Sequence, residues 1–256
     1  MKKFKDLNDQ DLEKYSRQII MKNIGFDGQL KIMNTSILII GCGGLGTSAL
    51  AYLSMAGIKK IGIADFDEVN LSNLNRQLLF TINDINKKKI DVAKRKLDQI
   101  GNDSDITTFK KKVNKKNIDS LVKKFEIILD CSDNFQTRYL INKSCNRNKK
   151  LLVSAALHNF EIQLFTFKSW LKTNPCYECI FPNIKKKMSI GNCDEMGIIS
   201  PIAGLGGLFQ ALTVIKIILD IKLIKFNEFL IFDGLNMEQK KITFKKNKTC
   251  CVCSNN

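Results

Sequence analysis

Four cysteines form two Cys-x-x-Cys pairs, Cys176 with Cys179 and Cys250 with Cys253. Two such pairs have the ligand spacing of a four-thiolate zinc site, which would fix the C-terminal segment to the body of the fold. Cys251 complicates the second pair, but only Cys250 has the required spacing to Cys253. A redox pair or unrelated small apolar residues are the alternatives to the zinc site that we predict.

A glycine-rich loop follows the apolar stretch 36–40, and Asp65 ends the next apolar stretch. Glycines let a backbone approach a phosphate, the N–H groups of a following helix bind the anion, and an acidic residue at this distance can hold a ribose hydroxyl. The loop therefore predicts a ligand that contains adenosine, without separating NAD, FAD and ATP. A tight turn with close packing is the alternative. The predicted binding residues are Gly41, Gly43, Gly44, Gly46 and Asp65.

The loop after Asp65 is crowded with polar side chains, which include Asp67, Asn73, Arg76 and Gln77. A nicotinamide dinucleotide has no use for an arginine there. A triphosphate does, because Arg76 and a downstream lysine can neutralise charge on its β- and γ-phosphates. This loop favours a nucleoside triphosphate.

Two further residues could take part in chemistry. Asp133 follows the apolar stretch 126–131, where the carboxyl end of a strand would place it beside a ligand and allow it to hold Mg²⁺. Cys193 lies in a polar stretch downstream of three lysines, a setting that favours an accessible thiolate. An incidental surface cysteine is the alternative for Cys193.

The hydrophobic periodicity predicts an α/β fold with a doubly wound, Rossmann-like, mostly parallel sheet and added C-terminal antiparallel strands. Strands are expected at 36–40, 60–65, 126–131, 151–155, 164–167, 229–233 and 241–244. Helices are expected at 8–23, 44–56, 87–100, 137–148 and 205–219. We predict one domain over 1–256, with a nucleotide-binding half at about 34–155 and a zinc-bearing half at about 156–256.

Composition argues against a nucleic-acid-binding, membrane or secreted protein. The net charge is +16, but the lysines are scattered along the chain, so we predict solvated surfaces and no nucleic-acid partner. The stretch 198–219 is the one candidate for a membrane span, and Gln210, Lys216 and several glycines favour a buried helix instead. Nine cysteines without a signal peptide predict a cytoplasmic protein with no membrane partner.

Together these motifs resemble a known family, the adenylyltransferases that activate ubiquitin-like sulfur carrier proteins (the ThiF and MoeB type, relatives of the ubiquitin-activating enzymes). The resemblance extends nearly from end to end of the chain. It rests on Tyr15–Ile19, Phe26–Gln29, the glycine loop, Asp65–Gln77, Leu129–Asn134, Pro175–Cys179, Cys193–Pro201 and Cys250–Cys253.

The resemblance implies that the carrier's C-terminal Gly-Gly carboxylate attacks ATP, releasing pyrophosphate and leaving an acyl-adenylate for later sulfur transfer. It implies Gly41, Gly43, Gly44, Gly46, Asp65, Asp67, Asn73, Arg76, Gln77, Lys89 and Asp133 at the nucleotide, and Arg17, Arg76, Lys89, Asp133 and Cys193 in catalysis. Lys87 and Lys88 compete with Lys89, which we choose because Ile90 follows it. Arg17 would reach the ATP of a partner subunit, and Cys193 would link to the carrier in thiamine-pathway members.

The resemblance also implies cofactors and partners. The cofactors are ATP, Mg²⁺ and Zn²⁺, and the partners are a ubiquitin-like carrier, bound by the zinc-bearing half, and a second copy of the chain. Because the sequence ends three residues after Cys253, sulfur is expected from a separate cysteine desulfurase or sulfurtransferase. The pathway, thiamine or molybdopterin, stays open. An NAD- or FAD-dependent oxidoreductase is the alternative, and it would leave Arg76, Asp133 and the paired cysteines unused.

Overall fold

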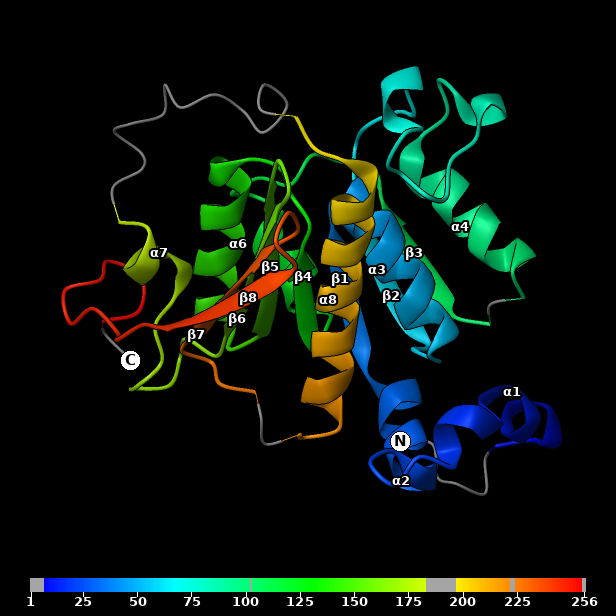
Figure 1. Cartoon of the computed structure of the whole chain (residues 1–256), viewed down its shortest axis with the longest axis horizontal. Coiled ribbons are helices and arrows are strands. Elements are labelled where there is room, and N and C mark those ends of the chain that lie inside the picture. The colour runs from blue at the N-terminus through cyan, green and yellow to red at the C-terminus, as the bar shows by residue number, and fades with distance from the viewer. Residues whose placement is uncertain (1–6, 102, 183–196, 222–223, 255–256) are drawn as a thin grey trace.

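The computed structural model describes residues 7–101, 103–182, 197–221 and 224–254. Within them the chain forms one eight-stranded sheet of order β3-β2-β1-β4-β5-β6-β7-β8 (Figure 1). The strands are β1 Ser36–Ile40, β2 Lys60–Ala64, β3 Asp105–Phe109, β4 Ile127–Asp130, β5 Leu151–His158, β6 Glu161–Phe167, β7 Glu228–Asp233 and β8 Glu238–Thr243. The helices are α1 Asp9–Ile19, α2 Gly25–Asn34, α3 Gly44–Met55, α4 Lys89–Gln99, α5 Ile118–Val122, α6 Phe135–Arg147, α7 Tyr177–Ile180 and α8 Ser200–Ile218.

The sheet changes direction at β5. Strands β3, β2, β1, β4 and β5 are mutually parallel, whereas β6, β7 and β8 pair antiparallel. β5 therefore belongs to both halves of the sheet, with β4 on one side and β6 on the other. β8 lies at the edge, and all of its residues are exposed. The predicted fold class, a mostly parallel sheet with added antiparallel strands, is confirmed.

Two apolar layers cover the two faces of the sheet. On one face, Ile37 and Ile39 of β1 pack with side chains of α3, α4 and α8. On the other face, Leu38 and Ile40 pack with side chains of α5 and α6. Every residue of β1 is buried, as expected for a central parallel strand whose two faces are both covered.

Helix α8, expected at 205–219, begins earlier, at Ser200, with Pro201 in its first turn. It lies beside α3 over the sheet (Figure 1). The contact is close because a Cβ on Gly207 would lie 2.3 Å from the carbonyl oxygen of Leu45. By length and composition α8 could cross a membrane, but core helices share this composition, and seven of its residues are buried here.

The helix predicted over 8–23 is present but shorter than expected. α1 ends at Ile19, and a second helix, α2, begins at Gly25, whose φ of +59° interrupts the helical path. The strand β3 and the short helices α5 and α7 were not predicted from the sequence. These elements have only four or five residues each, which is too few for a clear hydrophobic period.

Candidate functional site

A cavity of about 320 Å³ opens at the carboxyl ends of β1, β2 and β4. In an open α/β sheet this edge is the usual place for a ligand. Ten of the eleven residues predicted to bind nucleotide line it: Gly41, Gly43, Gly44, Asp65, Asp67, Asn73, Arg76, Gln77, Lys89 and Asp133. Gly46 lies behind the loop, where a Cβ would come within 2.0 Å of the Gly41 carbonyl oxygen. Its contribution is close packing of the helix on the loop.

The glycine loop is fixed by its backbone and by Asp65. Gly41 has a φ of +98°, and a Cβ there would lie 2.5 Å from the Cys131 carbonyl oxygen, so the position requires glycine. The Asp65 carboxylate accepts hydrogen bonds from the backbone N–H of Cys42 at 2.6 Å and of Asp67 at 2.8 Å. Burial raises the pKa of Asp65, while these two bonds and Lys89 oppose the rise. The carboxylate is thus held in one position beside the loop.

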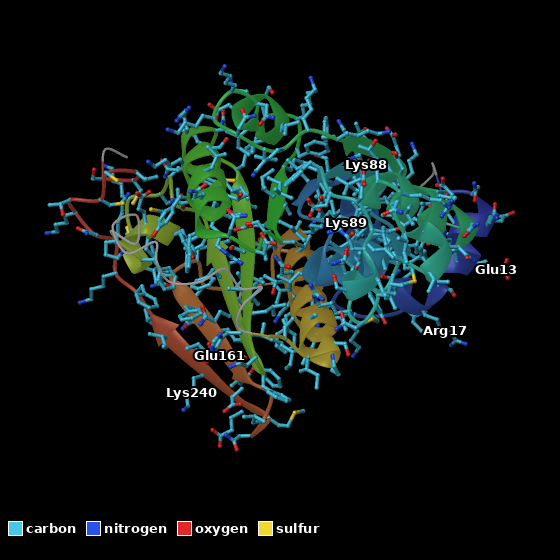
Figure 2. The ribbon with its side chains drawn as sticks, turned by 90° about the horizontal axis from the view of Figure 1, so that it is seen from above. Glu13, Arg17, Lys88, Lys89, Glu161 and Lys240 are labelled. Atoms are coloured by element: carbon cyan, nitrogen blue, oxygen red, sulfur yellow. The ribbon has the colours of Figure 1, made fainter. Side chains whose placement is uncertain are left out.

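Of the three adjacent lysines, Lys89 is the one that lines the cavity. Its ammonium is nearly buried and lies 3.1 Å from a carboxylate oxygen of Asp67. Lys88 instead pairs with Glu68 outside the cavity, and Lys87 donates to the Asn83 carbonyl. Figure 2 shows Lys88 and Lys89 as separate side chains at neighbouring positions. The structure therefore places Lys89, not its neighbours, where a ligand would bind.

Arg76 and Asn73 belong to one short turn on the cavity wall. Arg76 is half-buried, and its guanidinium donates to the Ser72 carbonyl at 2.8 Å and to Asn75 at 3.0 Å. The buried Asn73 side chain accepts from the backbone N–H of Asn70 and closes the turn. Both side chains line the cavity, so the Arg76 cation can contact a bound anion while the Asn73 amide holds the loop in place.

Beneath Asp133 lies a buried polar network that sequence reasoning missed. It contains Asp130, Ser132, Arg138 and Ser154, all less than a tenth exposed, and Ser132 and Arg138 also line the cavity. A signal was present in the sequence. Arg138 comes one helical turn after the helix-capping residue Asn134, and side chains on a helix point back toward its N-terminus.

One predicted catalytic residue, Arg17, does not line this cavity. Arg17 is exposed on α1, and Figure 2 shows it at one end of the molecule, away from Lys89. Cys193 lies outside the described residues. Cys42 and Cys131 are buried, and burial raises the pKa of both thiols, as expected of packing residues rather than nucleophiles.

The paired cysteines form a compact cluster beside α7, where the C-terminal segment meets the body of the fold (Figure 1). The sulfur atoms of Cys176, Cys179, Cys250 and Cys253 all lie within 4.8 Å of one another. Cys176 and Cys250 are 3.6 Å apart, and Cys179 and Cys253 are 3.4 Å apart. A tetrahedral zinc site with Zn–S bonds near 2.3 Å needs sulfur atoms roughly 3.8 Å apart. Cys251 is exposed and donates to Glu178 instead.

Comparison with known proteins identifies the chain's relatives. The model of the ThiF family matches residues 15–253. The sulfur carrier protein ThiS adenylyltransferase of Escherichia coli (strain K12) is 36% identical over 248 residues, which cover 96% of this chain and 97% of that protein. The adenylyltransferase and sulfurtransferase MOCS3 of Culex quinquefasciatus is 38% identical over 251 residues, which cover 98% of this chain but 57% of that protein. The chain thus spans little more than half the length of the MOCS3 relatives.

Solved structures share the fold at lower identity. E. coli MccB with ATP superposes with a TM-score of 0.78 at 21% identity, covering 98% of this chain and 83% of that one. MccB with MccA-N7isoASN has a TM-score of 0.81 at 22% identity, covering 98% of this chain and 76% of that one. These likenesses establish a common fold. With the family model matched from Tyr15 to Cys253 and a relative of nearly equal length at 36% identity, this chain belongs to the ThiF family.

Proposed function

We propose that this protein uses ATP to adenylate the C-terminal Gly-Gly carboxylate of a ubiquitin-like sulfur carrier protein. One observation carries the proposal. A single cavity gathers the glycine loop, the fixed Asp65 carboxylate, Asp133 and several cationic residues, among them Arg76 and Lys89. The names of the relatives, among them ThiS adenylyltransferase and MOCS3, support the same reaction, and a protein of the same fold, MccB, has been solved with ATP.

The side chains suit an attack by one anion on another. The carrier carboxylate is already ionised at neutral pH, so it needs no general base. It would attack the α-phosphorus, forming a new bond to oxygen while the bond to the β-phosphate breaks and pyrophosphate leaves. Lys89 and Arg76 would offset the mutual repulsion and stabilise charge on the leaving group. Asp65 would hold the ribose hydroxyls and so fix the reacting phosphate.

Asp133 fits a magnesium ion that accompanies the triphosphate. Its carboxylate lies on the cavity wall, and one oxygen accepts a hydrogen bond from Asn134 at 3.0 Å. Mg²⁺ in nucleotide sites keeps several waters and takes one or two carboxylates together with phosphate oxygens. One exposed carboxylate beside the phosphate loop meets that requirement. Bound there, Mg²⁺ would neutralise phosphate charge.

The test is isotope exchange between pyrophosphate and ATP. The purified chain should catalyse exchange with a Gly-Gly-ended carrier present and should lose it when the carrier lacks its last glycine. Tight binding of NAD with no exchange would instead favour an oxidoreductase. The family and the relatives give that alternative no support.

We also propose that the chain works as a homodimer in which Arg17 completes the site of the partner subunit. Arg17 does not line the cavity of its own chain. An apolar groove between α3 and α4 offers a surface for a second copy, with Tyr52, Met55, Leu78 and Ile100 each at least two-fifths exposed. Exposed apolar side chains gathered around a groove are typical of an interface.

Complementation should reveal the shared site. Arg17→Ala and Arg76→Ala homodimers should each be nearly inactive, because every site lacks one cation. The two proteins are mixed and their subunits are allowed to exchange. This should restore about a quarter of wild-type activity, since half of the dimers are then mixed and each mixed dimer has one intact site. The rate of pyrophosphate–ATP exchange would be measured for the mixture and for each unmixed protein. No recovery, despite mixed dimers seen by mass spectrometry, would place Arg17 outside the partner's site.

Cys193 is proposed to act after adenylation, in sulfur handling. Attack on phosphorus needs no thiol, so Cys193→Ala should keep pyrophosphate exchange within about twofold, as expected for a residue that does not stabilise the adenylation transition state. Covalent linkage to the carrier, followed by mass spectrometry, should be lost. Collapse of exchange in a folded Cys193→Ala protein would contradict this role. A separate sulfur donor, and the cytoplasm as the site of action, complete the proposal.

We propose Zn²⁺ as the metal of the cysteine cluster. The four sulfur atoms lie close to the separations that tetrahedral thiolate coordination requires, and a fully thiolate set is typical of structural rather than catalytic zinc. The ion would then hold the C-terminal segment against α7 and take no part in adenylation.

A further inference from the structure

Arg138 is a buried arginine beneath the loop that carries Asp133, and nothing in the proposed reaction uses it. Its side chain is 4% exposed. One terminal nitrogen, Nη1, donates to the Ala155 carbonyl at 2.7 Å and to the Ser154 hydroxyl at 3.3 Å. The other, Nη2, donates to the Ser132 carbonyl at 2.6 Å. The guanidinium thus connects the loop after β4 to strand β5.

Asp130 holds the same loop from the other side. One carboxylate oxygen accepts from the backbone N–H of Ser132 at 3.0 Å and from its hydroxyl at 2.5 Å. The other oxygen accepts from Ser154 at 2.8 Å and lies 3.8 Å from Arg138. The N–H, the carbonyl and the hydroxyl of Ser132 therefore all have partners, and the residue is held by two opposite charges.

The neighbouring residues leave Asp133 little backbone freedom. Ser132 precedes it, and Asn134 follows it as the cap of α6, accepting from the backbone N–H of Thr137 at 2.9 Å. The peptide that joins Ser132 to Asp133 is fixed through the carbonyl that Arg138 holds. The Asp133 side chain itself stays on the cavity wall.

Stability alone is a weak explanation for this arrangement. A buried ion pair often stabilises a fold no more than apolar residues of the same size would, because both charges lose their hydration. Here the pair is hydrogen-bonded to the backbone directly under a ligand cavity. Geometry held by such supporting hydrogen bonds is how a metal-binding carboxylate keeps its orientation.

We propose that Arg138 is a positioning residue for Asp133. By holding the Ser132 carbonyl, it keeps the Asp133 carboxylate turned into the cavity, where it binds the Mg²⁺ that accompanies ATP. The inference rests on the proposed function, which supplies the Mg·ATP ligand. Although Arg138 also borders the cavity, its guanidinium donates to protein oxygens, and it acts on the metal site only through Asp133.

The test is calorimetric binding of ATP in the absence of carrier, with Mg²⁺ and with EDTA. Wild-type protein should bind Mg·ATP more tightly than metal-free ATP. Arg138→Lys keeps a positive charge beside Asp130 but loses the planar fork that reaches two carbonyls. The ratio of its affinity for Mg·ATP to its affinity for metal-free ATP should fall roughly tenfold, in the range of outer-shell effects on metal sites.

Three variants sharpen the test. Arg147→Lys is the matched control on the same helix, because Arg147 is exposed and pairs with Asp119, and it should change neither affinity. Asp133→Asn should remove the preference for Mg·ATP, and adding Arg138→Lys to it should remove nothing more, because coupled residues are not additive. Ser154→Ala loosens Arg138 without removing its charge and should cause a smaller loss, which keeps the test open if Arg138→Lys does not fold.

The outcomes separate the two proposals. An Arg138→Lys protein that weakens both forms of ATP equally, or changes only its melting temperature, has lost a structural residue, and the positioning role is overturned. The positioning role is also overturned if the double variant loses more than Asp133→Asn alone. If wild-type protein binds no ATP, or if Asp133→Asn keeps the preference for Mg·ATP, the fault lies in the proposed function or its Mg²⁺ ligand, and this inference falls with it.

Discussion

Cys253→Ser is expected to lower the melting temperature of the zinc-loaded protein by about 10 °C or more, because a loss of about 4 kcal/mol shifts the midpoint of a chain this size by that amount. The physical reason is that four thiolates bind zinc only when folding brings them together, so the binding energy becomes folding energy. Removing one ligand opens the site and releases the C-terminal segment from α7. Calorimetry on protein with measured zinc content gives the result.

The control is provided by the adjacent residue. Cys251→Ser changes the same atom in the same short segment, but Cys251 is exposed and lies outside the cluster. It should keep one zinc per chain and a melting temperature close to that of the wild type. A strong chelator should lower the melting temperature of wild-type protein by as much as Cys253→Ser does. It should not lower the melting temperature of the Cys253→Ser protein any further. Metal-free wild-type protein of unchanged stability would refute the zinc site.

Lys89→Ala is expected to slow carrier-dependent pyrophosphate exchange by about 100-fold or more, as is usual when a group that stabilises transition-state charge is removed. The Lys89 ammonium is nearly buried on the cavity wall, where water screens it little and its interaction with phosphate is strong. The partner it leaves behind, Asp67, is about half exposed and remains hydrated. The fold should therefore survive, and circular dichroism would verify that it does.

Lys88→Ala is the matched control, because Lys88 makes an exposed pair with Glu68 outside the cavity. Exposed ion pairs contribute only about 0–1 kcal/mol to stability. Pyrophosphate exchange should therefore fall by no more than a few-fold in Lys88→Ala. Equal losses in the two variants would show that the lysines act only through the general positive charge of the surface. A loss confined to Lys88→Ala would contradict the assignment of Lys89.

The parts of the site that could be predicted from the sequence are those governed by local chemistry. The glycine loop needs Gly41 because its φ is positive, and Asp65 follows from the length of one strand-helix-strand unit. Strand β1 has the bounds predicted for it, since a continuous apolar run between polar residues leaves little choice. The Cys-x-x-Cys spacing likewise selected the four cysteines that the fold gathers.

The parts of the site that could not be predicted from the sequence depend on contacts between distant segments. Arg138 reaches Ala155, and Gln210 of α8 donates to the carbonyls of Asp130 and Val153. Because an arginine or glutamine in a helix is normally exposed, the position of Arg138 one turn after Asn134 does not by itself reveal its partner on β5, and Gln210 has no local signal. Among Lys87, Lys88 and Lys89, by contrast, the sequence favoured Lys89 because Ile90 follows it, and Lys89 is the one that lines the cavity.

Strand β5 bonds to β4 on one side and to β6 on the other, so the nucleotide cavity and the cysteine cluster are attached to one continuous hydrogen-bonded sheet. β5 is hydrogen-bonded along both of its edges, so unfolding of either half removes the backbone hydrogen bonds that hold one edge of β5 in the sheet. In native-state hydrogen exchange, the backbone amides of β4, β5 and β6 should therefore be released together, at the free energy of global unfolding. The two halves, distinct in their chemistry, should behave as a single cooperative unit.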